Sequence, residues 1–312
     1  KESPLTSLIT NTGAMNALNS LRSVNKGLET TQNRISTGLK VNSAKDNAAY
    51  YQISETMKGD SSAYASINEG LTLTKNSVAT ARLGAENFQE LASQFEERVA
   101  FAQGAKGGYG EIEKELTELV KQMTATVEQS TFNGDDMVNA DVIAAGVPAG
   151  TIVAATGVVT PTTNAVETRN IVTGVSRGSG SFDVTTMEIE TVDLAGLLSD
   201  FSAMATGFEA NAKSATDGET FLQGVLVSAE TALASATDAA TSLGLAEASI
   251  EGQQEFLTNL ADNIDSGVGS MIDADMEKEA AKLQALQVQQ QLATQALSIA
   301  NSAPQSVLSL FQ

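Results

Sequence analysis

The sequence offers few side chains that could carry out chemistry. Its 312 residues include no His and no Cys. That composition excludes thiol nucleophiles, imidazole general bases, Ser-His-Asp triads, disulfides and the usual zinc sites. A Gly-rich run at residues 104–110 lacks the Gly-Lys-Ser/Thr of a phosphate-binding loop, and we interpret it as a turn. We therefore expect no catalytic residue, no metal site and no cofactor.

Two acidic pairs are the remaining candidates for cation binding. Asp273 and Asp275 form an Asp-x-Asp pattern, but no Gly and no Glu follow at the spacing of an EF-hand loop. We interpret them as acids at the start of a helix, where a negative charge is favourable. Residues 133–136 read Asn-Gly-Asp-Asp, which is typical of a turn.

The charge of the chain excludes some classes of partner. Lys and Arg number 18 against 38 Asp and Glu, which leaves a net charge of -20. Such a chain is repelled by nucleic-acid phosphates and by anionic membranes. No apolar run approaches the roughly 18 residues that a membrane helix needs. We expect neither nucleic-acid binding nor membrane insertion.

The elements that would position any site are long helices. From Met57 to Ala102, apolar residues alternate mostly in steps of three and four, which indicates one helix in coiled-coil packing. The Gly-rich run ends it, and a second helix with Ile112, Leu116 and Met123 on one side should fold back against it. A similar register runs from Leu226 to Met271, with Glu247 and Gln254 interrupting its apolarity.

Both ends of the chain predict amphipathic helices. A terminal helix with one apolar stripe is marginal alone in water, so it must fold back on the chain or pack against another molecule. The spacing leaves both possibilities open. The stripe residues are Leu18, Leu21, Leu28 and Ile35 near the N-terminus, and Leu283, Leu286, Leu292 and Leu297 near the C-terminus.

The middle of the chain has a different pattern. Residues 140–192 are rich in Val, Thr, Gly and Ala and predict several short strands with Gly-rich turns, and residues 194–206 predict a short helix. Only 4% of residues are aromatic and none is Trp, so we expect a core of thin side chains. The fold class is therefore mainly α. Both chain ends form a long antiparallel helical-bundle or coiled-coil rod, with a small β module inserted in the middle and placed at its far end.

Four short motifs resemble one family. Residues 34–49 read R-I-S-T-G-L-K-V-N-S-A-K-D-N-A-A, which resembles the N-terminal signature of bacterial flagellins. T-F-N-G at 131–134 and M-I-D-A-D at 271–275 are similar to later elements of that family. The run A-P-Q-S-V-L-S-L-F at 303–311 resembles its C-terminal tail. One departure is Tyr50-Tyr51, which stands where flagellins usually have Gly, and we expect this pair to pack within the rod or against a neighbour.

The resemblance covers about residues 1–140 and 220–312 and implies an organisation in layers. In flagellins the terminal helices form an inner tube, the long helices form the next shell, and the variable region faces outward. Transferred to this chain, the parts are an N-terminal inner-core arm at 1–45, N-terminal rod helices at 46–139, a variable outer β module with a short helix at 140–219, a C-terminal rod helix at 220–267 and a C-terminal inner-core arm at 268–312.

The resemblance also implies the function. The chain would be a structural subunit, not an enzyme, that polymerises through its terminal coiled-coil helices into the extracellular flagellar filament, for motility. Its partners would be itself as a homopolymer, flagellar cap and hook-associated proteins, and an export chaperone on the C-terminal arm. Flagellins leave the cell through type III export without a cleaved signal peptide. The expected assembly residues are Leu18, Leu21, Leu28, Ile35, Leu283, Leu286, Leu292, Leu297 and Leu310.

Two alternatives remain open. A flagellar hook–filament junction protein has similar ends, and copy number would distinguish it from the filament subunit. A cell-surface protein that binds a glycan or a host surface is the second alternative. Its support is weak, because the middle module has few aromatic rings for a sugar to stack on. Arg169 and Arg177 could contact an acidic ligand there, although they fit solvated loop charges better.

The first prediction concerns Leu28. The variant Leu28→Asp should remain a soluble monomer but fail to polymerise, because a charged carboxylate in a dry seam costs more than the roughly 2–7 kcal/mol of an unpaired neutral polar group. Negative-stain electron microscopy after seeding checks this. Filaments of normal length from the variant would contradict the assembly assignment.

Overall fold

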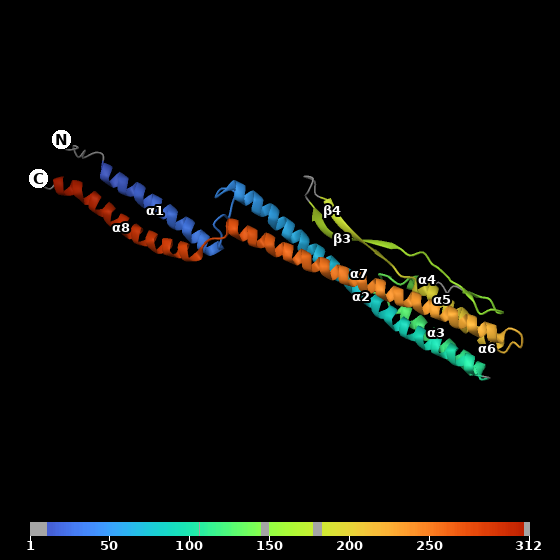
Figure 1. Ribbon diagram of the computed structural model, residues 1–312. Coiled ribbons are helices and arrows are strands. Elements are labelled where there is room, and N and C mark those ends of the chain that lie inside the picture. Colours follow the sequence, from blue (N-terminus) through green and yellow to red (C-terminus); the bar gives the residue numbers. More distant parts are fainter. Residues whose placement is uncertain (1–10, 106, 145–149, 177–182, 309–312) are drawn as a thin grey trace. The chain divides into compact units, whose positions relative to one another are not determined.

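The computed structural model describes residues 11–105, 107–144, 150–176 and 183–308 (Figure 1). The chain divides into two compact units. We name them the terminal unit, residues Lys1–Ser61 and Asp262–Gln312, and the central unit, residues Ser62–Ala261. Two long helices, α2 (Ala48–Gly104) and α7 (Gly218–Ile272), contribute residues to both units. None of the described helices contains a stretch that is long and apolar enough to cross a membrane.

The terminal unit is built on two antiparallel helices, α1 (Thr12–Thr37) and α8 (Met276–Leu308), which lie side by side (Figure 1). Asn11 caps α1 by accepting a hydrogen bond from the Ala14 amide. Gly38 ends the helix in the left-handed conformation at φ 73°, which glycine adopts without a steric penalty. The structure thus answers the question left open by the sequence, because each terminal helix folds against the other.

The central unit confirms the predicted heptad spacing. Helix α2 runs unbroken to Gly104, and α3 (Tyr109–Glu128) begins after Gly108, whose φ is 80°. Arg98 on α2 pairs with Glu115 on α3, as expected for an antiparallel return. The predicted seam residues of α2 are buried from its middle onward: Leu71, Val78, Ala81, Ala85, Phe88, Ala92, Phe95, Val99 and Ala102.

The polar interruptions in the seam of α7 face polar partners on α2. Glu247 Oε2 accepts a hydrogen bond from Arg82 Nε at 2.7 Å. Gln254 Nε2 donates to Thr72 Oγ1 at 2.9 Å. A buried or half-buried polar side chain needs such a partner, and each pair is satisfied in only one alignment of the two helices. These two contacts therefore define the register of α7 against α2.

The core of the central unit is aromatic at one place, contrary to the expectation of thin side chains throughout. Helix α5 (Leu194–Ala205) carries Phe201, whose ring lies 5.8 Å from that of Phe88 and 5.0 Å from that of Phe95. Helix α6 (Phe208–Ala212) carries Phe208, which packs edge-on against Phe221 of α7. All five rings are fully buried. Five of the ten phenylalanines are thus buried where α5 and α6 cover the long helices.

The remaining elements of the middle region are short. Helix α4 spans Ala140–Ala144. The strands form two antiparallel hairpins, β1 (Thr151–Ile152) with β2 (Val159–Thr160) and β3 (Thr168–Ser176) with β4 (Asp183–Glu190). The predicted strands and short helix are confirmed.

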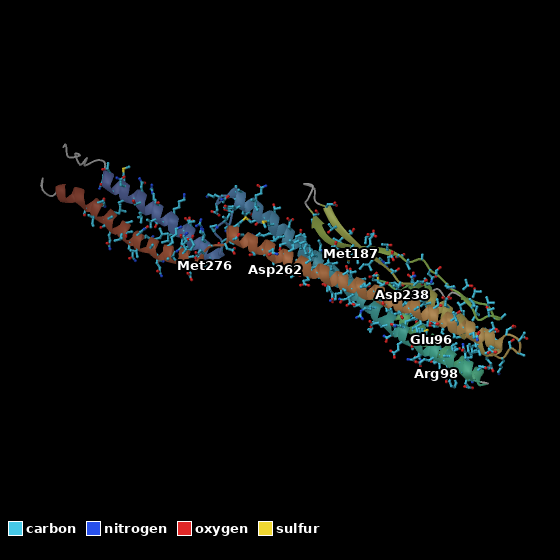
Figure 2. All side chains as sticks on the ribbon, viewed as in Figure 1. Glu96, Arg98, Met187, Asp238, Asp262 and Met276 are labelled. Carbon is cyan, nitrogen blue, oxygen red and sulfur yellow. The ribbon has the colours of Figure 1, made fainter. Side chains whose placement is uncertain are left out.

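We expected the β module at the far end of the long helices. The β3–β4 hairpin instead lies along the long helices of the central unit (Figure 1). Tyr64 on α2 donates from its hydroxyl to the Val175 carbonyl at 3.1 Å. Gln253 on α7 donates from its amide to the Thr173 carbonyl at 2.8 Å. On β4, the sulfur of Met187, which is labelled in Figure 2, accepts a hydrogen bond from the Ser249 hydroxyl of α7 at 3.1 Å. The expectation failed because the position of an insertion in the chain does not determine where it packs.

Glycines allow the loop between β1 and β2 to approach α7 closely. A Cβ atom at Gly224 would lie 1.7 Å from the Thr156 carbonyl oxygen, and one at Gly157 would lie 2.0 Å from the Phe221 carbonyl oxygen. Neither contact is possible for a larger residue, so the backbone of the loop must move if either glycine changes.

We predict that Gly224→Ala lowers the free energy of unfolding by about 1–3 kcal/mol, the usual cost of overpacking. The control is Gly252→Ala in the same helix, where an added Cβ meets nothing within 4 Å. This change should be neutral or stabilise by up to about 1 kcal/mol. Urea unfolding of the full chain, followed by circular dichroism, measures both. Equal effects of the two variants would contradict the close approach.

Candidate assembly interface

Two of the sequence motifs meet in a short backbone pairing that closes the terminal unit. Lys40 N donates to the Ile272 carbonyl at 2.6 Å, and Ala274 N donates to the Gly38 carbonyl at 2.8 Å. Beside these bonds, the side chain of Val41 is buried against Ile272. The segment after α1 is therefore tied to the segment before α8. We call this pairing the joint.

The residues after the joint start α2. Asp46 accepts hydrogen bonds from the amides of Asn42 and Ser43 and from the Ser43 hydroxyl, all within 3.2 Å. The Ser43 hydroxyl is the main cause that lowers the pKa of Asp46, because these donors favour the charged carboxylate. Asn47 then accepts from the amides of Ala49 and Tyr50, each at 3.1 Å, as an N-cap does. The Asp-Asn part of the motif thus forms the turn before α2 and caps the helix.

The two tyrosines at this place have different environments. Tyr51 packs against the buried cluster of Val41, Val268 and Ile272, as expected of a residue that packs inside the chain. Tyr50 is exposed. A large exposed ring beside the joint is available to another molecule.

Polar contacts align α1 and α8 along their length. Gln290 Nε2 donates to Asn25 Oδ1 at 2.8 Å, and Asn11 Nδ2 donates to the carbonyl of Ala300 at 2.8 Å. Near the joint, Arg34 forms an ion pair with Glu279 at 3.0 Å. From one contact to the next, the residue number rises along α1 and falls along α8, as it does in an antiparallel pair.

The predicted assembly residues fall into two groups. Leu18 and Leu292 are exposed. The others within the described residues are partly buried in a unit whose main helix contact is that between α1 and α8: Leu21, Leu28, Ile35, Leu283, Leu286 and Leu297. Leu310 lies outside the described residues. Most of the predicted interface therefore lies within one chain, and Leu28→Asp would disturb that pair as well as any contact with a neighbour.

Helix α8 has apolar residues on two sides. We call Leu283, Leu286 and Leu297 its inner face. Val288, Leu292 and Ile299 are 56%, 59% and 70% exposed, and we call them the second face. At about 100° per residue, the two sets lie on nearly opposite sides of the helix. The sequence analysis missed Val288 and Ile299, although their spacing of four and seven from Leu292 was a signal that could have found them.

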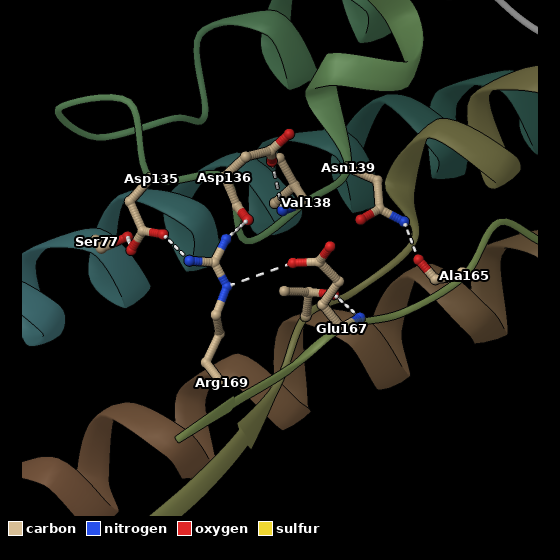
Figure 3. A network of polar contacts seen from close by, with 9 residues as sticks. Ser77, Asp135, Asp136, Val138, Asn139, Ala165, Glu167 and Arg169 are labelled. Carbon is tan, nitrogen blue, oxygen red and sulfur yellow. Dashed lines mark hydrogen bonds and ion pairs between the residues drawn. The ribbon is translucent and has the colours of Figure 1, made fainter. Parts of the chain in front are cut away.

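The acids and cations singled out in the sequence are used inside the chain. Arg169 on β3 pairs with Asp135 at 2.8 Å and donates to the Asp136 carbonyl at 3.2 Å (Figure 3). We expected Arg169 to be a solvated loop charge, and that expectation was wrong. Arg177 lies outside the described residues. Asp275 accepts from the Lys278 amide at 3.1 Å, which confirms the helix-start interpretation for this residue. Asp273 instead directly follows the last residue of α7 and donates its amide to the Gly269 carbonyl.

The turn predicted at residues 133–136 is also confirmed. Asn133 and Gly134 have φ angles of 51° and 81°, and Asp136 accepts from the amides of Val138 and Asp141. Within the described part of the chain, no group of three or more carboxylates is arranged to hold a metal ion.

Comparisons with known proteins agree with the sequence motifs. The family model for the bacterial flagellin N-terminal helical region matches residues 8–141, and the model for the bacterial flagellin C-terminal helical region matches residues 226–311. The chain is 36% identical to a flagellin of Brucella melitensis over 309 residues, which is 99% of this chain and 100% of the relative. It is 33% identical to flagellin C of Rhizobium meliloti over 321 residues, at the same coverage of both chains.

We predict that the pKa of Asp46 in the folded chain lies below its ordinary value and that Ser43→Ala raises it, because the hydroxyl donor is lost. Since the folded pKa is the lower one, the Asp46 hydrogen bonds stabilise the turn before α2 above the unfolded pKa, and this stabilisation is lost as pH falls through the folded pKa. Carboxyl ¹³C shifts measured against pH report this. An unchanged Asp46 titration in Ser43→Ala would contradict the assignment.

Proposed function

The chain belongs to the bacterial flagellin family, and we propose that the second face of α8 is the surface through which its copies polymerise. A flagellin is a structural subunit of the bacterial flagellar filament, which is an extracellular assembly. The proposal concerns the part of the chain that makes the contact between copies. It replaces most of the residues chosen from the sequence by Leu292 together with Val288 and Ile299.

The observation that carries this proposal is the exposure of three large apolar side chains on one side of a helix whose other side is already used. Burying such a side chain is worth about 1.5–3 kcal/mol. Met15 and Leu18, both exposed on α1, add apolar surface to the same unit. Because these residues do not lie on the inner face of α8, a contact with them needs no opening of the α1–α8 pair.

Such a contact would build an open polymer. An interface between two different surfaces generates a closed ring if its rotation closes and an open helical filament if it does not. We propose that the second face of one copy packs against the terminal helices of the next. The arms at residues 1–45 and 268–312 would then be the inner layer, residues 46–139 and 220–267 the rod, and residues 140–219 the outer module.

The same surface suggests how the subunit is handled before assembly. An exposed apolar face must be covered to keep the chain from aggregating. We propose that an export chaperone covers α8, that the chain leaves the cell by type III export without a cleaved signal peptide, and that cap and hook-associated proteins meet its terminal helices in the filament. The absence of catalytic activity is part of this proposal.

The alternatives find no support in the described structure. A cavity of about 520 Å³ lies between α5, α7 and residues 158–166, and it is the place where a surface ligand such as a glycan would be sought. No aromatic ring lines it. Its walls include the carboxylates Glu190, Asp193, Asp200 and Asp238, and burial raises the pKa of Asp200. A neutral sugar lacks the stacking surface that it usually needs there, and nothing favours a junction protein over a filament subunit.

We predict that Leu292→Asp abolishes filament growth, because the variant places a charge in a contact that must become dry. The concentration needed for polymerisation should rise at least about tenfold, which corresponds to a loss of about 1.4 kcal/mol per contact. Seeded polymerisation, followed by light scattering and electron microscopy, measures this rise.

The matched control is Gln287→Asp, which places the same charge on an exposed position of α8 between its two apolar faces. It should polymerise as the wild type does. Equal polymerisation of the two variants would contradict the proposal that the second face forms the contact between copies. Intact α1–α8 contacts in Leu292→Asp would show that the substitution did not disrupt the helix pair.

A further inference from the structure

Helix α8 has two apolar faces, and α1 could pack against either of them. Each face carries three large aliphatic side chains at helical spacing, so α1 could bury its stripe against either one. Burial of apolar area is not directional and does not distinguish the two faces strongly. Yet in the structure α1 takes the inner face and leaves the second face exposed. Something other than apolar area must make this choice.

A buried ion pair distinguishes the inner face. Glu279 lies four residues before Leu283, on the same side of α8, and its side chain is only 10% exposed. Its Oε1 atom is 3.0 Å from Nη1 of Arg34, which is 28% exposed. Among the described residues, Arg34 is the cation that the inner face meets from α1.

The surroundings of this pair are costly rather than stabilising. Glu279 Oε2 and Thr31 Oγ1 are buried and have no hydrogen-bond partner within the described structure. The nearest further cation, Lys282, is 3.9 Å from Glu279 Oε2. A buried polar group with unmet bonds lowers stability, and its best-attested use is to select one arrangement among several.

A second contact, seven residues away on each helix, also favours the inner face. Gly27 stands seven before Arg34, and Leu286 stands seven after Glu279. A Cβ atom at Gly27 would lie 3.3 Å from Leu286 Cδ2, so the glycine makes room for the leucine. The two contacts therefore form together when α1 lies on the inner face.

The second face cannot offer both contacts. It has an acid near the start of the helix, Glu277, but Gln284 stands seven residues after it instead of a leucine. On that face, Arg34 could find a carboxylate only by giving up the apolar contact at Gly27. The inner face alone pairs a carboxylate with a leucine at the spacing that α1 requires.

We propose that the Arg34–Glu279 pair, together with Gly27 facing Leu286, selects which face of α8 packs against α1 of the same chain. The pair thereby keeps Val288, Leu292 and Ile299 free for the next copy. This inference rests on the proposed function, because the second face matters only if it makes contacts between copies. Arg34 and Glu279 act as positioning residues.

The test uses charge reversal and charge exchange. Arg34→Glu and Glu279→Arg should each raise the concentration needed for polymerisation at least tenfold. The double variant Arg34→Glu/Glu279→Arg restores the attraction with exchanged charges and should return this concentration to within about twofold of the wild type. A double variant as defective as the single ones would overturn the proposal.

Disulfide formation reports the chosen face directly, because the chain has no other Cys. Asn25→Cys/Gln290→Cys probes the inner face, where these two side chains are in contact. Asn25→Cys/Val288→Cys probes the opposite side. In the otherwise unchanged chain under polymerising conditions, only the first pair should close within one chain. Copolymers of ¹⁵N-labelled and unlabelled protein separate intrachain from interchain bonds by mass.

Adding Glu279→Arg to these reporters should weaken the first disulfide and strengthen the second, and adding Arg34→Glu as well should reverse both changes. Loss of the first disulfide without any gain of the second would overturn the proposal, since the pair would then only hold the helices together. The control Glu277→Arg should leave both disulfides unchanged. Suppose that Leu292→Asp polymerises normally while the two disulfides respond to the charge exchange as expected. The proposed contact between copies is then wrong, but the selection of the α8 face by the Arg34–Glu279 pair is supported.

Discussion

The structure of the terminal unit depends on one constraint: α8 is apolar on two nearly opposite sides, and α1 can cover only one of them. Within a single chain, α1 therefore cannot bury both apolar faces of α8. The inner face is buried within the chain, and Leu292 with its neighbours of the second face remains in water at a cost that another copy can remove. The proposed contact between copies would use this combination, because the second face is the apolar surface of α8 that α1 does not cover.

The family motifs serve the geometry that keeps this constraint in place. Arg34 pairs with Glu279, Gly38 ends α1, and Asp46 with Asn47 starts α2. Backbone bonds at the joint tie Gly38 to Ala274, and Lys40 and Val41 to Ile272, just before α8 begins. The hydrogen bonds of these residues end one helix, start the next and fix where the two chain ends meet.

The central unit is stabilised differently. There the long helices are covered by α5 and α6, and five phenylalanine rings pack in one group of three and one pair. Polar pairs such as Arg82 with Glu247 define the register of α7 against α2. Since this unit buries its own core, it can carry the β3–β4 hairpin on its side without requiring another copy to complete it.

Much of this protein follows from its sequence alone. Heptad spacing located the long helices and their break at Gly104, and the absence of His and Cys excluded most catalytic and metal chemistry. Four motifs identified the family. These features depend on backbone geometry within a few residues, on composition, or on short runs of residues, which a sequence displays directly. Only the tertiary structure decided which partner each apolar stripe meets, where the hairpin packs and that Arg169 pairs with Asp135. Periodicity shows that a helix has an apolar side, but the partner of that side is determined by contacts between residues hundreds of positions apart.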